Sequence, residues 1–191
     1  MAIAGGRPTK RWTAAEVERL IALGAIDHPE RYELLNGELK EKMGQNLPHI
    51  AGIAGTVEAL RAVFGGAFYV ATQCPIKGDP HSEPEPDAAV YRGDLREFQR
   101  VGPRLQNLAL VIEISDTSLL DDREEKAAIY ARFGVPEYWI VNVRERTLEV
   151  RRAPEGTGWG QGFVVGEVGT ISPLERPEAA IPVADLLPPL P

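Results

Sequence analysis

The stretch 108-LALVIEISD-116, together with 84-PEPDAAVYRG-93 before it, decides the fold of this chain. Each stretch has the composition of a buried strand, and each carries a carboxylate: Asp87 at the start of one and Glu113 within the other. A carboxylate that is buried without a partner costs several kcal/mol. We therefore expect both acids to have a partner, and the identity of that partner points to the function.

The strand around Glu113 is apolar on both of its faces. Because side chains alternate along a strand, Glu113 faces away from Ile112 and Ile114. Strands that are apolar on both faces usually lie in the middle of a sheet that is covered on both sides. If this strand pairs with the strand that Asp87 begins, the two acids lie close enough to share one cation.

The rest of the chain carries the signals of alternating helices and strands. Thr13 and Glu16 form a capping-box pattern that predicts a helix over 14–23. Asn36-Gly37 between two strand-like runs predicts a hairpin over 31–42. The other expected elements are helices over 49–64 and 121–133, a polar connection over 93–105, and strands over 67–76, 87–91, 108–115, 137–143, 147–153 and within 159–171.

Length and composition predict one mixed α/β domain with a central sheet flanked by helices. The chain has 191 residues, of which 43% are hydrophobic and 26% charged. We expect a single domain over 1–191, with a core over about 10–153 and C-terminal strands and tail over 154–191. The only cysteine, Cys74, excludes an internal disulfide and a cysteine-based zinc site. No run approaches the roughly 18 consecutive apolar residues of a membrane span, and no secretion signal is present, so a cytoplasmic location is expected.

The net charge of −7 and the pI near 5.1 argue against binding of nucleic acid by bulk electrostatics. They do not exclude an enzyme that meets phosphate through a bound divalent cation, because acids around a metal make the charge negative. Carboxylate oxygens suit Mg²⁺ or Mn²⁺. The alternative interpretation is that Asp87 and Glu113 are each solvated at a strand end.

A more specific signal lies in 121-DDREEKAAIYARFGVPEYWIVNV-143. With this segment, the chain resembles the mostly bacterial Uma-type restriction endonuclease family of the PD-(D/E)xK nuclease superfamily. The matching residues are Pro86-Asp87, 111-VIEISD-116, Lys126 with Tyr130, 134-GVPEYWIVN-142, the hairpin 32-YELLNGEL-39 and His49. The resemblance runs from about residue 10 to the C-terminus. It implies a restriction-endonuclease-like fold with an N-terminal helix and hairpin, and an endonuclease that hydrolyses DNA, possessing no small-molecule cofactor.

The chain departs from the superfamily pattern at the lysine. In the superfamily, the second acid and a lysine stand two residues apart on one strand, whereas this chain has Glu113-x-Ser115. The resemblance implies that the lysine has moved to the following helix, where Lys126 stands. The alternative is that Lys126 only pairs with Asp122 at i−4, which is worth a few tenths of a kcal/mol.

The resemblance and the spacing together give a hypothesis for the chemistry. Asp87, Glu113 and a backbone carbonyl near Ile114 would hold Mg²⁺, and Lys126 would orient the attacking water and neutralise growing charge. Glu33 is the candidate accessory acid by resemblance, and Glu38 competes for that role. His49 is either a phosphate contact or a helix-capping residue.

Partners are less clearly indicated by the sequence. Arginines at 92, 96, 100 and 104 recur every four positions, and they are the best candidates for contact with a DNA backbone. The resemblance also suggests a homodimer that cuts both strands. The competing interpretation is a nuclease-like fold without catalytic activity that serves as a binding or regulatory module, because fold does not imply activity.

Overall fold

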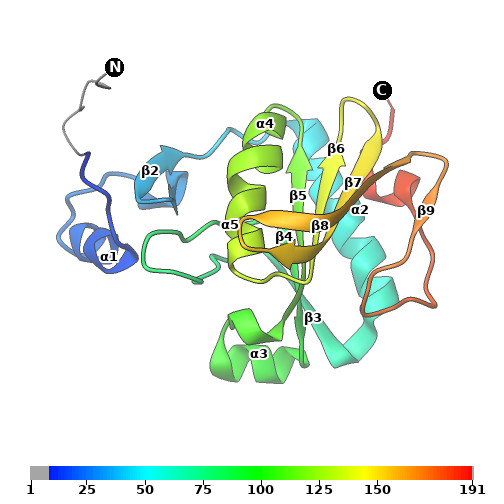
Figure 1. The fold of residues 1–191 in the computed structure, drawn as a ribbon, viewed down its shortest axis with the longest axis horizontal. Helices are drawn as coiled ribbons and strands as arrows, with labels where there is room; N and C mark the ends of the chain where they lie inside the picture. The colour runs from blue at the N-terminus through cyan, green and yellow to red at the C-terminus, as the bar shows by residue number, and fades with distance from the viewer. Residues whose placement is uncertain (1–8, 191) are drawn as a thin grey trace, which may run out of the picture.

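A six-stranded mixed sheet forms the centre of the protein in a computed structural model that describes residues 9–190 (Figure 1). Its strand order is β3-β4-β5-β6-β7-β8, and every neighbouring pair is antiparallel except β5–β6. The strands are β3 (Phe68–Thr72), β4 (Ala88–Arg92), β5 (Leu108–Ser115), β6 (Glu137–Asn142), β7 (Thr147–Glu155) and β8 (Gly158–Gly166). The predicted mixed α/β architecture with a central sheet is confirmed.

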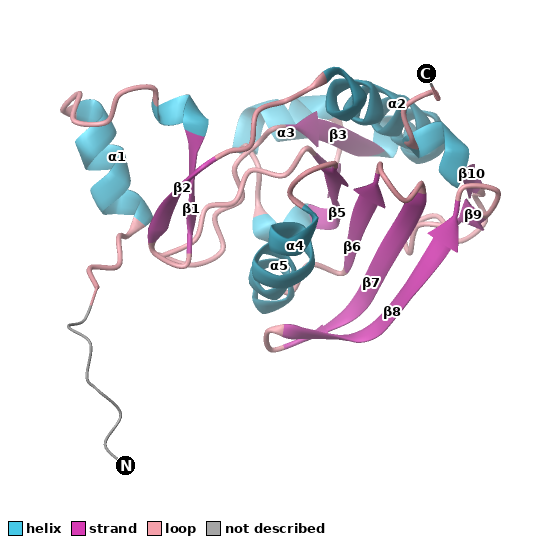
Figure 2. Ribbon diagram, turned by 90° about the horizontal axis from the view of Figure 1, so that it is seen from above, coloured by secondary structure: helices cyan, strands magenta, loops and turns pink. Residues whose placement is uncertain are grey.

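Helices cover both faces of this sheet (Figure 2). These helices are α2 (Leu47–Phe64), α3 (Leu95–Val101), α4 (Leu119–Asp121), a π-helical turn (Asp122–Lys126) and α5 (Ala127–Arg132), whereas α1 (Ala14–Ala22) lies apart from the sheet. One apolar cluster joins α2 to the side of β5 that carries Ile112 and Ile114, and another joins α5 to the side that carries Val111. Glu113 therefore lies on the α5 side, as the alternation of side chains predicts.

The central strand β5 is buried along its whole length. It pairs with β4 in antiparallel register, with Ala88 opposite Ile112, so the predicted pairing of the two acid-bearing strands is confirmed. On its other side, β5 runs parallel to β6. The parallel connection requires a crossover, and α4, the π-helical turn and α5 supply it. This crossover places a helix directly after the carboxyl end of β5.

An N-terminal unit of α1 and a two-stranded hairpin stands beside the main sheet (Figure 2). The hairpin consists of β1 (Tyr32–Leu35) and β2 (Glu38–Glu41). Its turn residues Asn36 and Gly37 both have positive φ, 49° and 85°, which is the backbone that an Asn-Gly type I′ turn requires. The predicted capping box of α1 is also present.

The C-terminal segment returns to the sheet and packs against α2. Strands β9 (Thr170–Ile171) and β10 (Ile181–Pro182) pair with each other, and a 3₁₀ turn over Val183–Leu186 follows. Val183 and Leu186 are buried in the same apolar cluster as α2. Further 3₁₀ turns cover Pro29–Arg31, Gly65–Ala67 and Leu105–Asn107.

Three local expectations differ from the structure for identifiable reasons. The connection over 93–105 contains α3, because the Asp94 side chain accepts a hydrogen bond from the Glu97 amide at 2.8 Å and caps a helix. The expected strand over 67–76 ends at Thr72, because Gln73 takes a φ of 48°. The helix expected from residue 121 begins two residues earlier.

The sequence has no run of about 18 consecutive apolar residues, yet α2 has the length and mean hydropathy of a candidate membrane span. Residues Leu47–Ala67 have a mean hydropathy of 1.3, so by length and composition alone this helix could cross a membrane, with 28% of the apolar window buried in the fold. Such a test is also passed by core helices. Here Val57, Leu60 and Phe64 recur at helical spacing and pack on the sheet.

The contact between α2 and β5 is tight at Gly52, and this contact predicts a mutational effect. A Cβ at Gly52 would lie 2.7 Å from Ile114 Cγ2, which is too close for unstrained packing. We expect Gly52→Val to destabilise the protein by about 2 kcal/mol and to lower Tm by about 6 °C in thermal unfolding. Ala54→Val, on an exposed position of the same helix, is the control. Equal losses for both variants would contradict the close packing.

Candidate active site

A cleft of about 840 Å³ opens at the carboxyl end of β5. Its walls come from the hairpin, the start of α2, the residues before β4, and the π-helical turn. Asp87, Glu113, Lys126 and Glu33, which are far apart in sequence, all line it. Eight carboxylate residues line this cleft against four lysines and arginines and one histidine, so it is markedly acidic.

Asp87 is held at the point where the pairing of β4 with β5 stops. The last paired residues are Ala88 and Ile112, so the amide of Ile114 lies beyond the ladder. Asp87 Oδ2 accepts a hydrogen bond from this amide at 2.7 Å, and its Oδ1 lies 3.0 Å from His49 Nε2. The side chain of Asp87 thus takes the place of a strand partner for the Ile114 amide. This hydrogen bond fixes the orientation of the Asp87 carboxylate.

Glu113 is 3% exposed and is held by two hydrogen-bond donors. Its Oε1 accepts from Tyr130 Oη at 2.7 Å and from Lys126 Nζ at 3.1 Å. Burial raises the pKa of Glu113 well above its usual value, and neighbouring carboxylates add to the increase while Lys126 opposes it. The charged form of Glu113 therefore depends on nearby positive charge.

Lys126 supplies that positive charge to several carboxylates at once. Its Nζ lies 3.1 Å from Glu113, 3.3 Å from Glu33 and 4.0 Å from Asp122. The i−4 contact with Asp122 is the longest of the three, so the structure places the lysine on the acid of β5, where the displaced-lysine hypothesis expects it. Burial lowers the pKa of Lys126, but the carboxylates, Glu113 foremost, raise it more and keep the ammonium protonated.

The hairpin delivers Glu33, and not Glu38, to the cleft. Glu33 is 9% exposed on β1, and its Oε2 accepts a hydrogen bond from the Glu85 amide at 3.2 Å. Glu38 is exposed at the start of β2 and does not line the cleft. The hairpin is docked by an isolated bridge between Leu34 and Glu83 and by the Asn36 amide, which donates to Ser82 Oγ.

Asp122 is a site residue that the sequence pattern did not reveal. It is 1% exposed and accepts a hydrogen bond from Ser118 Oγ at 2.6 Å, and burial raises its pKa. It lies in a π-helical turn, a feature frequent at functional sites. Tyr138 Oη donates to the Asp122 carbonyl at 3.0 Å. The available signal was the acid four residues before Lys126, which on its own indicates only a helix-surface pair.

His49 lies in the first turn of α2, where Asn46 is the N-cap, and its ring contacts the candidate site. Its amide donates to the Asn46 side chain at the start of α2, and its ring reaches Asp87. Burial lowers the pKa of His49, but the carboxylate of Asp87 raises it more, so the net direction is upward. The expectation that His49 caps a helix is wrong, because Asn46 fills that position. Contact of His49 with a phosphate stays a prediction.

The donors in the cleft fit a hard divalent cation. Within residues 9–190, no three His, Cys, Asp or Glu side chains already form a metal cage. A cation here would therefore combine the carboxylates of Asp87 and Glu113 with backbone and water oxygens, which is the usual manner of Mg²⁺. The excess of acids over bases around the cleft favours such a cation electrostatically.

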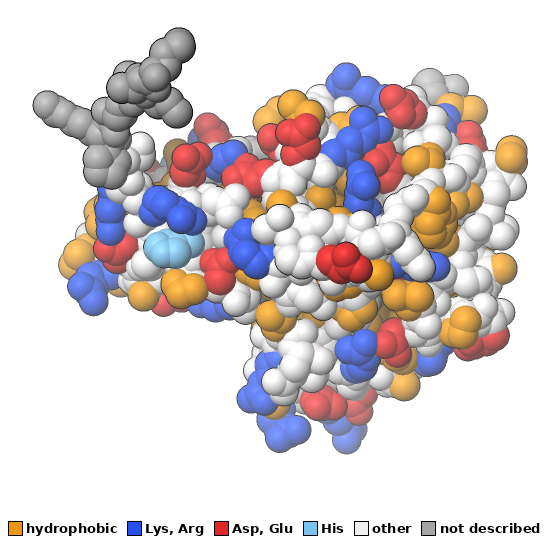
Figure 3. Space-filling view, in the orientation of Figure 1, with side chains coloured by type: hydrophobic (Ala, Val, Ile, Leu, Met, Phe, Trp, Pro, Cys, Tyr) orange, Lys and Arg blue, Asp and Glu red, His pale blue; other side chains and the backbone are white. Residues whose placement is uncertain are grey.

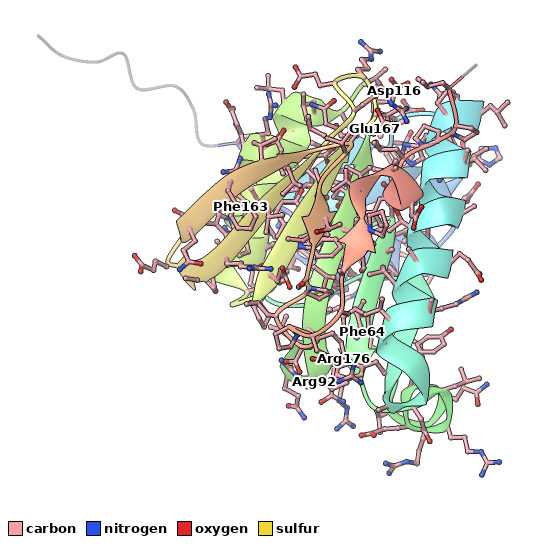
Figure 4. All side chains as sticks on the ribbon, turned by 90° about the vertical axis from the view of Figure 1, so that its right-hand side faces the viewer. Phe64, Arg92, Asp116, Phe163, Glu167 and Arg176 are labelled. Carbon is pink, nitrogen blue, oxygen red and sulfur yellow. The ribbon has the colours of Figure 1, made fainter. Side chains whose placement is uncertain are left out.

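The arginine series predicted as a DNA contact lies away from the cleft. Arg96 and Arg100 are on α3, which lies at the other end of the sheet from α4 (Figure 1). Arg92 bonds Glu175, and Figure 4 shows it at the opposite end of the sheet from Asp116, which follows β5. These arginines are therefore not placed to hold DNA at the candidate site.

A mixed sheet with paired acids at the end of its central strand defines a nuclease-like α/β protein. The crystal structure of a putative nuclease belonging to DUF820 from Anabaena variabilis ATCC 29413 shares this fold, with a TM-score of 0.65 and 15% identity over 87% of this chain and 96% of that chain. The model of the Uma2 family, described as "Putative restriction endonuclease", matches residues 14–184.

The chain therefore belongs to the Uma2 family, and the family resemblance seen in the sequence is confirmed. No curated protein sequence matches the chain significantly. Family and fold together support a nuclease, for which DNA is the expected substrate.

The shared use of Lys126 predicts a pH-dependent stability effect. Lys126→Ala leaves Glu113 and Glu33 buried without their cation, and loss of one partner of a buried pair costs about 3–5 kcal/mol. The pKa of Glu113 is raised from 4.5, so its protonated form is favoured in the folded state. The destabilisation should therefore be small near pH 4.5 and grow as pH rises through the folded pKa.

Urea unfolding of both proteins at pH 5 and pH 8 measures this difference. Lys77→Ala, which breaks an exposed pair with Glu18, is the control and should cost less than about 1 kcal/mol at either pH. A loss from Lys126→Ala that is the same at both pH values would contradict the role of Lys126 as counter-charge.

Proposed function

We propose that the protein is a Mg²⁺- or Mn²⁺-dependent endodeoxyribonuclease. The observation that carries the proposal is the convergence of Asp87, Glu113 and Lys126 on one acidic cleft at the end of β5. In such a cleft, a phosphodiester meets repulsion unless a cation is present, so metal dependence follows from the charge of the lining. Membership of the Uma2 family supports the same reaction.

Asp87 and Glu113, with the backbone carbonyl of Ile114, would hold the metal ion. When bound, the ion polarises the phosphoryl oxygen and lowers the pKa of a water molecule. Asp87 is oriented for this by the Ile114 amide and by His49, and Glu113 by the hydroxyl of Tyr130. These hydrogen bonds fix the ligand oxygens before a substrate arrives, which reduces the reorganisation that binding requires.

Lys126 would act on the attacking water and on the phosphate of the substrate. Its ammonium can orient the attacking water and stabilise the negative charge that grows on the phosphoryl oxygens. Glu33 holds the ammonium from the opposite wall at 3.3 Å, so it serves as the accessory acid that positions the lysine. His49, beside Asp87, is placed to approach a neighbouring phosphate group.

Metal binding and cleavage are separable by mutation. Mg²⁺ or Mn²⁺ should raise Tm of the wild type, and Asp87→Asn should remove most of that gain and lower the nicking rate of supercoiled plasmid by more than about 100-fold. Asp185→Asn, exposed and remote from the cleft, should change neither.

Lys126→Ala should keep the metal-induced rise in Tm and lose about 100-fold in nicking rate. Nicking that persists in this variant would remove the lysine from the mechanism. If wild-type protein gains stability from metal but cuts no DNA, the fold serves instead as a noncatalytic binding module.

We further propose that two copies pair through the edge strand β8. Its nine residues, GWGQGFVVG, contain no charge and no proline, the features that usually protect an exposed edge from pairing. Phe163 and Val164 are 41% and 63% exposed on it. Because the strand is uncharged, it can pair with its own copy in antiparallel fashion without like-charge contacts, as a two-fold interface requires.

A lysine in the middle of this edge should prevent the pairing. Val164→Lys brings two equal charges into the paired strands, so we expect a monomer where the wild type sediments as a dimer. Val168→Lys, outside β8 and fully exposed, should leave the dimer intact. A monomeric wild type at micromolar concentration would overturn the proposed pairing and leave the nuclease proposal untouched.

A further inference from the structure

Four exposed apolar side chains stand on the segments that form the walls of the candidate active site, and we call them the apolar rim. They are Met43, Leu47, Ile50 and Leu120, with exposed fractions of 59%, 77%, 48% and 66%. Met43 lines the cleft itself, Leu47 and Ile50 flank His49 in the first turn of α2, and Leu120 directly precedes Asp121 of the cleft wall.

Three of the rim residues come from two segments that lie beside each other. Asn46 at the start of α2 bonds Asp116 at the end of β5, so this end of α2 stands beside the chain that leads into α4. Figure 3 shows apolar side chains over α4 among charged neighbours. Large apolar residues exposed to this degree around a polar cleft usually contact a ligand or partner.

The basic residues of the cleft are poorly available to bind the phosphates of a DNA duplex. Each of its four basic residues already has a carboxylate partner within the part of the chain that the structure describes: Arg31 with Glu41, Lys40 with Glu125, Lys42 with Glu85, and Lys126 with Glu113 and Glu33. Duplex DNA carries one negative charge per about 1.7 Å, twice the density of a single strand. An acidic cleft repels the duplex more strongly than the single strand.

An unpaired DNA strand also exposes the apolar faces of its bases, to which the apolar rim can bind. The apolar faces of bases are hidden in a duplex but exposed in a single strand, where stacking on aromatic side chains strengthens binding about tenfold per base. Aliphatic side chains such as leucine and methionine also contact base faces, as they do when they wedge between the base steps of a kinked duplex. The apolar side chains of the rim are thus suited to contact the exposed base faces. Only a few phosphates of a single strand would have to enter the acidic cleft.

From these observations, we infer that the cleft takes an unpaired DNA strand, whose bases lie against Met43, Leu47, Ile50 and Leu120 while one phosphate enters the acidic centre. The inference rests on the proposed nuclease function and narrows its substrate to single-stranded DNA and to unpaired regions within duplexes. It also accounts for how a nuclease with a net charge of −7 would hold DNA at an acidic cleft.

Binding measured without cleavage tests the inference. Fluorescence anisotropy with Ca²⁺ would compare a labelled 20-nucleotide single strand, the blunt duplex of the same sequence and a duplex with a central bubble. We expect the single strand and the bubble to bind at least about tenfold more tightly than the duplex. The affinity for the single strand should fall with salt at a logarithmic slope no steeper than about −1.5, as for two phosphates.

Rim variants test the contact itself. Leu47→Ser combined with Leu120→Ser should weaken single-strand binding by about tenfold or more and keep the Tm rise produced by Ca²⁺. The matched control is Leu23→Ser with Val168→Ser, two leucine or valine positions that are 74% and 103% exposed outside the cleft lining. This control should bind as the wild type does.

Three results would overturn the inference: equal or tighter binding of the duplex, unchanged binding by the rim variant, or binding to phosphatidylcholine vesicles that the rim variant loses. The proposed function fails differently. A protein that binds single strands through its rim but cuts no DNA with Mn²⁺ would end the nuclease proposal and leave the inference intact.

Discussion

The ammonium group of Lys126 is the charge that allows three acids to be buried together. Glu113, Glu33 and Asp122 come from the central strand, the N-terminal hairpin and a π-helical turn, and each has its carboxylate within 4.0 Å of Lys126 Nζ. Without a counter-charge, each would carry a desolvation cost of several kcal/mol. Burial raises the free energy of the charged carboxylates and, for the same reason, strengthens their attraction for a cation. The stability of the cleft and its proposed chemistry therefore both depend on the burial of these acids.

The proposed function requires an acidic protein to act on an acidic polymer. A net charge of −7 repels nucleic acid at a distance, and the cleft itself is more acidic than basic. Attraction must then come from groups that act at contact: a divalent cation, the apolar rim and hydrogen bonds. Interactions of this kind depend weakly on salt, whereas those of a basic groove depend on it steeply. Membership of the Uma2 family is thus compatible with a charge that would otherwise argue against DNA.

Local patterns in the sequence were sufficient to predict the central sheet and the positions of the two acids on its central strands. Alternation of side chains along 108–115 placed Glu113 on the other face of the strand from Ile112. Pairing of this apolar strand with the apolar strand that follows Asp87 brought the two acids to the same part of the sheet. The roles of Glu33 and Asp122 were beyond such patterns, because they depend on how distant elements dock. Glu33 reaches the cleft on a hairpin that is docked by a bridge from Leu34 to Glu83, and Asp122 is buried at the start of a π-helical turn. The displaced lysine was found through family resemblance, since its spacing alone favoured a surface pair.

Docking of the hairpin couples the N-terminal unit to the chemistry. Glu125, one residue before Lys126, receives hydrogen bonds from Asn36 and Lys40 of the hairpin, while Glu33 of the same hairpin holds the Lys126 ammonium. The hairpin therefore contacts the π-helical turn at Glu125 and at Lys126. Because a carboxylate site tolerates little displacement of its positive partner, the position of this small unit sets the charge balance of the whole cleft. The residues that hold the hairpin therefore contribute to the geometry of the candidate active site.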